Sequence, residues 1–141
     1  MSESGALARL KRRFVEPPPG LDPTYHRYYA AVRYGYPIAL AWHVLFIVLF
    51  ALVGATPLAW INVASVAIWV LVVWLHLEGH LRTGVALSIL EVTLHAVLAV
   101  MLIGWDTGFQ YYLLVLAATI FFTPLGPVPL KAATAAGVAG L

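Results

Sequence analysis

The sequence predicts an all-α protein, a polytopic bundle of membrane-spanning helices. Of its 141 residues, 62% are hydrophobic and only 10% are charged, whereas soluble domains have roughly 45–50% apolar and 25% charged residues. The mean hydropathy is +0.91. Long apolar runs recur after residue 36, and about 20 such residues cross the roughly 30 Å of hydrocarbon in a bilayer. Helices are expected because lipid offers no partner for an open strand edge.

Residues 1–36 are predicted to form a cytoplasmic tail, because no apolar run in them is long enough for a signal peptide. The basic segment from Arg9 to Arg13 is expected to lie as a short amphipathic helix on an anionic leaflet. Three consecutive prolines at 17–19 then end that helix. From Asp22 or Thr24 a second short helix is expected to bring tyrosines and arginines into the interface, as an aromatic and basic belt that anchors the chain.

Four complete spans and the start of a fifth are expected after the tail. The complete spans cover residues 37–54, 57–77, 83–103 and 107–123, and the partial one covers 130–141. The apolar run from Ala132 to Leu141 has about half the length that a span needs. We interpret it as the start of a fifth helix that has been cut, with any soluble output domain beyond Leu141. A re-entrant or surface helix is the alternative.

All eight Lys and Arg residues fall on one side of this topology. Six lie in the first 33 residues, Arg82 lies in the second loop, and Lys131 follows the fourth span. Because basic loops stay in the cytoplasm, we expect a multi-pass protein of the bacterial inner membrane with its amino terminus inside. Topology also explains the sequence pI of 9.1. The expected partner is therefore the lipid bilayer, and we expect no nucleic-acid partner.

The most informative polar residues stand inside the third predicted span. Glu91 and His95 are four residues apart, so they share one helical face. A carboxylate near the bilayer centre costs roughly 2.5–3.5 kcal/mol even on the lenient insertion scale, so both should face the bundle interior. His43, His76 and His80 are further candidates, the last two weaker because HLEGH lies near the interface. We predict His43 or His80 within reach of the pair, in the cytoplasmic half of the bundle.

Three kinds of site fit these side chains. Imidazole and carboxylate four residues apart on neighbouring helices build metal sites in bundles, and histidine pairs also hold haem. The favoured alternative is an interhelical hydrogen-bonded network in which Glu91 is neutral or paired to a histidine. A small-molecule or proton-linked site is the third. The H-x-E-x-H spacing differs from the H-E-x-x-H zinc protease signature, and without cysteine all thiolate sites are excluded. The cofactor, metal or haem, is left open.

The segment from Gly104 to Tyr112 predicts a helix break followed by a new helix. Gly104 suits a helix C-cap, and Asp106 or Thr107 can cap the next helix. Its aromatic residues fit a belt at the outer interface. A well-built extracytoplasmic turn is the leading interpretation, and Asp106 and Gln110 are candidates for binding a polar ligand there.

A family resemblance rests on a pattern that is strongest over residues 88–124. It comprises Glu91 and His95, the turn GWDTGFQYYLL at 104–114, and Phe121, Phe122 and Pro124. Residues 37–141 resemble the six-helix amino-terminal membrane region of bacterial nucleotide cyclases, class III adenylate/guanylate cyclases first and GGDEF diguanylate cyclases second. The resemblance implies a sensor or anchor domain that relays a signal through its last helix to a cytoplasmic cyclase homodimer making cyclic AMP or cyclic di-GMP. Helices five and six are incomplete or absent, and no catalytic residue of a cyclase can be placed on this chain.

Three functions of different classes follow. The first is the sensory membrane module of a nucleotide cyclase, homodimeric through its membrane domain, with Glu91, His95, His43 and His80 sensing a ligand or holding a cofactor. The second is a membrane redox protein that binds metal or haem through the same cluster. The third, a transporter or channel subunit, needs a polar pathway across the bilayer, yet the outer halves of the predicted spans are almost wholly apolar. The sequence shows no nucleophile–base arrangement and no phosphate-binding glycine loop.

Overall fold

The computed structural model describes residues 12 and 14–141, so most of the basic segment from Arg9 to Arg13 lies outside the described residues. The described chain contains helices and turns and no strand, as the sequence predicts. The elements in order are η1 (Pro23–Tyr25), α2 (His26–Leu52), α3 (Thr56–Leu77), α4 (Leu81–Ile103), η2 (Trp105–Thr107), α5 (Tyr111–Ile120) and α6 (Val128–Ala139).

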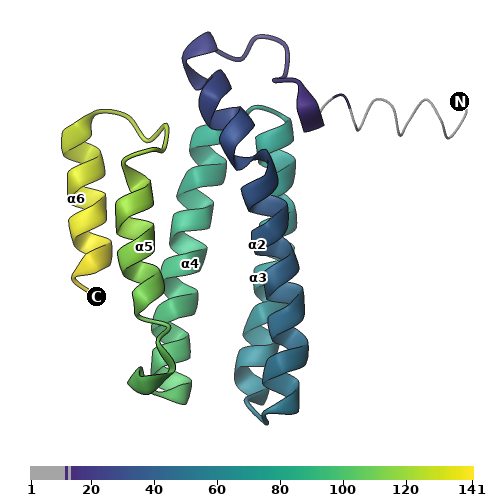
Figure 1. The fold of residues 1–141 in the computed structure, drawn as a ribbon, viewed down its shortest axis with the longest axis vertical. Helices are drawn as coiled ribbons and strands as arrows, with labels where there is room; N and C mark the ends of the chain where they lie inside the picture. Colours follow the sequence, from purple (N-terminus) through teal and green to yellow (C-terminus); the bar gives the residue numbers. More distant parts are fainter. Residues whose placement is uncertain (1–11, 13) are drawn as a thin grey trace, which may run out of the picture.

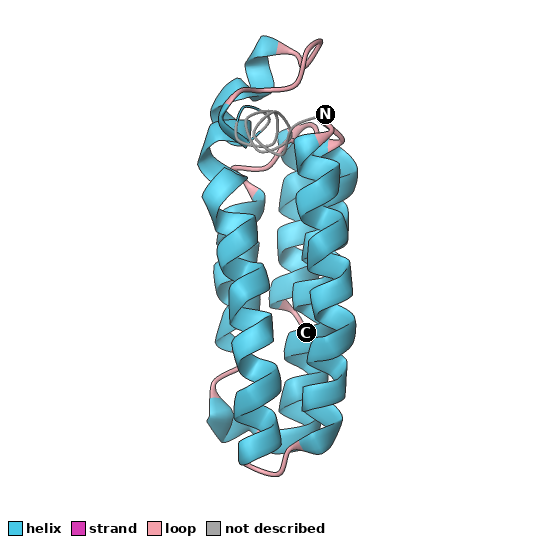
Figure 2. Cartoon of the chain, turned by 90° about the vertical axis from the view of Figure 1, so that its right-hand side faces the viewer, coloured by secondary structure: helices cyan, strands magenta, loops and turns pink. Residues whose placement is uncertain are grey.

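Three of these helices, α2, α3 and α4, are long and apolar enough to cross a membrane. Their 27, 22 and 23 residues correspond to about 40, 33 and 35 Å. They stand side by side along the length of the molecule in two perpendicular views (Figures 1 and 2). Large apolar side chains are exposed on their outer faces, among them Leu52 (80%), Trp60 (70%) and Met101 (75%). Such a surface is expected where helices meet lipid, so the fold supports a membrane protein.

Helix α2 begins at His26, whereas the sequence predicted a short interfacial helix and a separate span from Pro37. The structure runs both together, with Pro37 inside the helix. A proline in a helix interior removes one backbone hydrogen bond, but packing of the residues before Pro37 against α3 holds this helix together. Tyr29 and Tyr36 are buried, and their rings lie 4.2 and 5.4 Å from the ring of His76 on α3. Tertiary contacts therefore outweigh the local signal.

The turn between α3 and α4 depends on a glycine. Gly79 has φ +83°, which L side chains rarely adopt, and a Cβ there would lie 2.9 Å from Cγ of Pro18. The proline segment before η1 therefore packs directly against this turn. Arg82 adds a hydrogen bond of 3.0 Å from its Nη2 to the hydroxyl of Tyr25.

Basic residues gather at this same end of the bundle. Arg27 and Arg33 stand early in α2, Arg82 in the first turn of α4, and Lys131 in the first turns of α6. Figure 1 shows the beginnings of these three helices at one end. The turns at the other end, residues 53–55 and 104–110, carry no Lys or Arg. The described basic residues therefore lie at one end of the bundle, as the sequence predicts. Which membrane holds the protein, and whether this end faces the cytoplasm, stay predictions.

Helix α5 is shorter than the span predicted over residues 107–123. Gly104 ends α4 as predicted, with φ +92°, and Gly108 has φ +81°. Between these glycines the chain forms η2, which uses the residues expected for the first turn of the next helix. Thr107 donates its hydroxyl to the carbonyl of Gly104 at 2.7 Å, and the residue that precedes α5 is Gln110. The predicted cap at Asp106 or Thr107 is therefore wrong.

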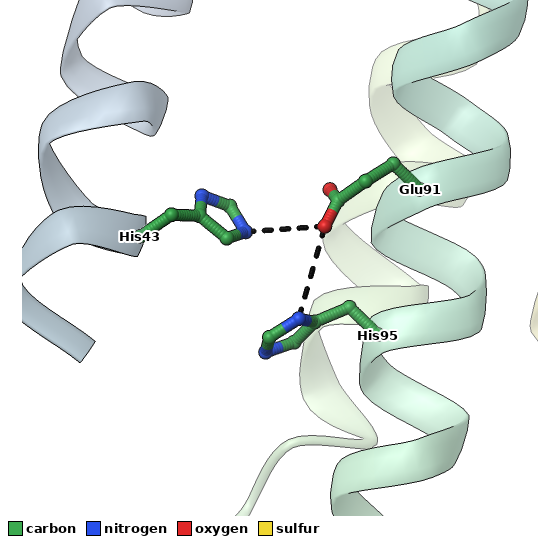
Figure 3. Close-up of side chains that lie close together, drawn as sticks. All are labelled: His43, Glu91 and His95. Atoms are coloured by element: carbon green, nitrogen blue, oxygen red, sulfur yellow. Dashed lines mark ion pairs between the residues drawn. The ribbon is translucent and has the colours of Figure 1, made fainter. Parts of the chain in front are cut away.

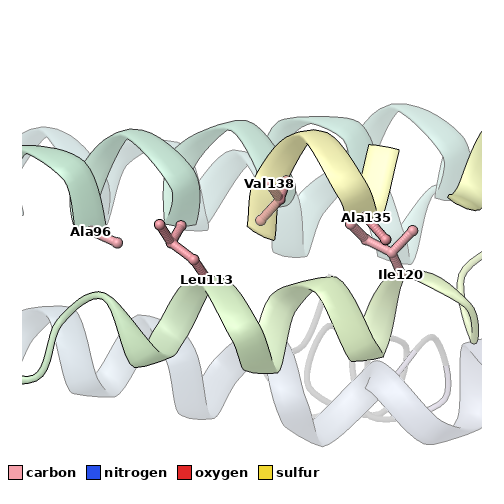
Figure 4. Close-up of a cluster of buried hydrophobic side chains, with 5 residues drawn as sticks. All are labelled: Ala96, Leu113, Ile120, Ala135 and Val138. Carbon is pink, nitrogen blue, oxygen red and sulfur yellow. The ribbon is translucent and has the colours of Figure 1, made fainter. Parts of the chain in front are cut away.

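Helix α6 lies where the sequence placed the partial fifth span, and it returns beside α5 (Figure 1). Buried side chains from α4, α5 and α6 form one apolar cluster, which comprises Ala96, Leu113, Ile120, Ala135 and Val138 (Figure 4). Two of its members are alanines, whose small side chains let helices approach closely, as is typical of membrane bundles.

Candidate functional site

Three of the seven predicted site residues meet at one point in the bundle. His43 extends from α2 toward Glu91 and His95 on α4 (Figure 3). Oε1 of Glu91 lies 3.3 Å from Nε2 of His43 and 3.7 Å from Nδ1 of His95. All three are buried, with exposed fractions of 9%, 4% and 7% for His43, Glu91 and His95. We call these three residues the His–Glu–His cluster.

The cluster lies near the middle of the bundle, and its place in the cytoplasmic half stays a prediction. Glu91 stands ten residues after the start of α4 and twelve before its end, or about 15 and 18 Å along the axis. The prediction counted His43 from Pro37, whereas α2 begins at His26. The cluster is therefore far from water at either end, and its polar atoms must find partners in protein or in a bound ligand.

Contacts from two other groups fix the orientation of the cluster. The indole Nε1–H of Trp69 on α3 donates to Oε2 of Glu91 at 2.8 Å. Nδ1 of His43 lies 2.7 Å from the carbonyl oxygen of Ala39. Because a carbonyl oxygen only accepts, Nδ1 carries the hydrogen, and in the neutral imidazole Nε2 presents a lone pair to Glu91.

The remaining polar atoms of the cluster are less well satisfied. Nδ1 of His95 lies 3.4 Å from the hydroxyl of Ser65. Oε1 of Glu91 and Nε2 of His95 have no hydrogen-bond partner among the residues that the structure describes. A carboxylate oxygen thus faces two imidazole nitrogens across 3.3 and 3.7 Å. With Nε2 of His43 unprotonated, a positive charge between it and Oε1 of Glu91, a proton or a metal ion, relieves the repulsion of their electron pairs.

An apolar cavity of about 310 Å³ adjoins the cluster, at the lower end of the size range of ligand pockets. His43 and His95 are the two histidines that line it. Aromatic side chains form most of the remaining wall, namely Trp42, Phe46, Trp69, Phe109 and Tyr112. A ligand in this cavity would therefore meet rings on most sides and imidazole at one side.

The other four predicted site residues lie elsewhere. His76 is buried, and its ring stacks on that of Tyr29 at 4.2 Å, which joins α3 to the start of α2. His80 precedes the first residue of α4. Asp106 is exposed in η2, and Gln110 precedes α5 with its Oε1 buried and unpartnered within the described chain. A ligand role for these four stays a prediction.

Sequence reasoning missed three residues that complete the site: Trp69, Ser65 and Phe109. Ser65 and Trp69 are four residues apart inside an apolar helix, and the N–H of a buried tryptophan needs an acceptor. That spacing is a signal that could have found them. Phe109 stands 6.1 Å from the ring of His95, measured between centroids. It reaches the cluster only because the η2 turn folds back, which no local pattern indicates.

The geometry excludes a Ser–His–acid triad. Ser65 and Glu91 both approach Nδ1 of His95, whereas a triad places serine and carboxylate on opposite nitrogens of the imidazole. What the arrangement can do is hold a proton, hold a metal ion, or bind the polar end of a ligand in the cavity. No protein-family model, curated protein or solved structure matches this chain.

Proposed function

We propose that this chain is the membrane sensory and anchoring module of a bacterial nucleotide cyclase, with adenylate cyclase preferred. The observation that carries the sensory part is the buried His–Glu–His cluster beside an apolar cavity. Ionisable groups inside a membrane bundle are costly and mark functional sites. The resemblance of residues 88–124 to the membrane regions of nucleotide cyclases supports the choice of family.

In this proposal the amino terminus lies in the cytoplasm and the chain crosses the bacterial inner membrane four times. Helices α2, α3 and α4 make the first three crossings. Helix α5, with its 10 residues, completes the fourth together with the turns on either side of it. Helix α6 begins a fifth. The basic residues at the starts of α2, α4 and α6 support this orientation.

Ligand binding would reach the output through α5 and α6. Phe109, in the turn before α5, and Tyr112, in its first turn, line the cavity together with His95. Helix α5 packs on α6 through the apolar cluster of Figure 4. A change in the cavity therefore acts directly on the helix pair that leads toward a cytoplasmic catalytic domain. Class III catalytic domains act as dimers, so a homodimer through the membrane domain belongs to the proposal.

A second candidate is a membrane redox protein that holds a metal or haem. It is favoured by one observation: His43, Glu91 and His95 each offer a ligand atom, and these atoms lie within 4.8 Å of one another. Redox turnover of the isolated chain with an artificial electron acceptor would favour this candidate over the sensor.

Two measurements test the proposal. The chain has no cysteine, so Thr83→Cys in the first turn of α4 and Asp106→Cys in η2, beyond the other end of α4, each introduce one unique thiol. A membrane-impermeant maleimide on intact cells should label Asp106→Cys and leave Thr83→Cys unlabelled until the cells are opened. Labelling of both from the same side refutes the topology. The coding sequence downstream of Leu141 tests the family: a further span and a half and a cyclase domain is expected, and a stop codon refutes the cyclase assignment.

A further inference from the structure

We propose that the His–Glu–His cluster binds one divalent first-row transition-metal ion through His43, Glu91 and His95. This inference rests on the proposed function, because the ion would be the ligand of the proposed sensor. The residues supply two imidazoles and one carboxylate from two helices. Two histidines and a glutamate with an open fourth position are an established ligand set for zinc, and two histidines and a carboxylate also bind non-haem iron.

The two distances from Glu91 to the histidines fit a small ion between these side chains. Two ligand atoms that each lie about 2.1 Å from a tetrahedral metal ion are about 3.4 Å apart. Oε1 of Glu91 lies 3.3 Å from Nε2 of His43 and 3.7 Å from Nδ1 of His95. A hydrogen bond between charged groups is shorter, about 2.7–2.9 Å. These two distances suit an ion between the side chains better than a proton. The three ligand atoms as a set lie within 4.8 Å of one another, so we expect the two imidazoles to move closer together when the ion binds.

Each of two ligands is oriented by a hydrogen bond on its far side. His43 donates from Nδ1 to the carbonyl of Ala39 at 2.7 Å, which leaves Nε2 free to coordinate. Oε2 of Glu91 accepts from Nε1 of Trp69 at 2.8 Å, which directs Oε1 toward the histidines. Outer hydrogen bonds of this kind are a regular feature of metal sites, because they fix the tautomer and the direction of the ligand.

The ligand set narrows the class of ion. Mg²⁺ and Ca²⁺ prefer cages of oxygen ligands, and this cluster supplies one carboxylate against two imidazoles. A haem between the rings would have to displace Glu91, whose Oε1 already contacts both histidines. A fourth position on the ion faces the cavity, because His43 and His95 line the cavity wall. The metal can therefore take a small polar ligand that enters among the aromatic rings.

Metal analysis of the purified chain tests the proposal. The 141-residue chain is extracted from membranes in mild detergent with a tag free of histidine, stripped with a chelator, and titrated with Co²⁺. We expect saturable binding of one Co²⁺ per chain, with visible d–d absorption that equimolar Zn²⁺ removes. Glu91→Gln and His43→Gln should each weaken Co²⁺ binding at least about 100-fold, and Trp69→Phe about 10–100-fold, as loss of an outer contact does.

His76→Gln is the matched control, because His76 is also buried in the bundle but lies outside the cluster. It should bind Co²⁺ as the parent chain does. Absence of saturable binding to a chain with native helicity overturns the metal site, as does equal loss in His76→Gln and the cluster variants. The cysteine labelling tests the topology independently of metal binding. A chain that binds no metal but has the proposed topology refutes the metal site and does not contradict the sensory module. Labelling that contradicts the topology refutes the module, whatever the metal content.

Discussion

Replacing Trp69 by phenylalanine tests whether one hydrogen bond holds the buried carboxylate in place. Trp69 and Glu91 are each 4% exposed, and the bond from Nε1 to Oε2 is 2.8 Å long. Phenylalanine keeps an aromatic ring beside Tyr36 and His43, which lie 5.8 and 5.6 Å away between centroids. Only the donor and part of the ring volume are lost.

The expected loss of stability follows from two ranges of hydrogen-bond energies, one for soluble proteins and one for membrane proteins. A hydrogen bond to a charged group contributes about 1.5–3 kcal/mol in soluble proteins. Interhelical bonds measured in a membrane bundle average about 0.6 kcal/mol, with a maximum of about 1.7. Since Oε1 of Glu91 lacks a hydrogen-bond partner in the described chain, loss of the Trp69 bond leaves the carboxylate without any. We therefore expect Trp69→Phe to lower the free energy of unfolding by about 1–2 kcal/mol, near the upper end of the range for membrane proteins.

A double-mutant cycle isolates this bond from the packing term. The free energy of unfolding is measured by denaturing detergent in mixed micelles, with a chelator present so that metal binding does not add to stability. Trp69→Phe is made in the parent chain and in a Glu91→Leu background, where the acceptor is gone. Trp74→Phe, a 53% exposed tryptophan on the same helix, controls for the ring change. A coupling energy below about 0.3 kcal/mol, the usual error of additivity, would refute the hydrogen bond as the contribution of Trp69.

Two further predictions concern the basic end of the bundle. Gly79→Ala should destabilise the chain by at least about 1 kcal/mol, because φ is +83° and the new Cβ would meet a proline carbon at 2.9 Å. Thermal unfolding measures this loss of stability. An unchanged midpoint temperature contradicts the close approach. Hydrogen bonds from the amide and hydroxyl of Thr24 lower the pKa of Asp22. Its stabilisation of η1 is therefore present above the ordinary pKa of an aspartate and lost as pH falls through the lowered pKa. The amide resonance of Thr24 should follow this titration, and Asp22→Asn should abolish it.

The sequence predicts best the elements that local rules define. Helices α3 and α4 begin at Thr56 and Leu81, within two residues of the spans predicted from 57 and 83, because polar and glycine residues mark the turn between them. The buried pair Glu91 and His95 follows from the spacing of four and from the cost of polar groups in lipid. Both inferences need only the residues of one helix and its ends.

Tertiary contacts decide the features that the sequence did not reveal. The start of α2 depends on rings that pack across to α3, and these contacts keep the helix intact through Pro37. The length of α5 depends on two glycines with positive φ, of which Gly104 was recognised and Gly108 was not. The approach of His43 to Glu91 depends on the rotation of α2 against α4. None of these follows from the periodicity of a single segment.

The carboxylate of Glu91 makes polar contacts that connect the three long helices. In lipid, apolar helices gain little from burying one apolar face against another, so packing detail and polar contacts decide how they are oriented. Glu91 on α4 contacts His43 of α2 through one oxygen and Trp69 of α3 through the other. A rotation of either neighbour would remove its polar group and leave one oxygen of the buried carboxylate without that partner, which is costly in a medium without water. The residues that form the site thus also select one arrangement of the bundle.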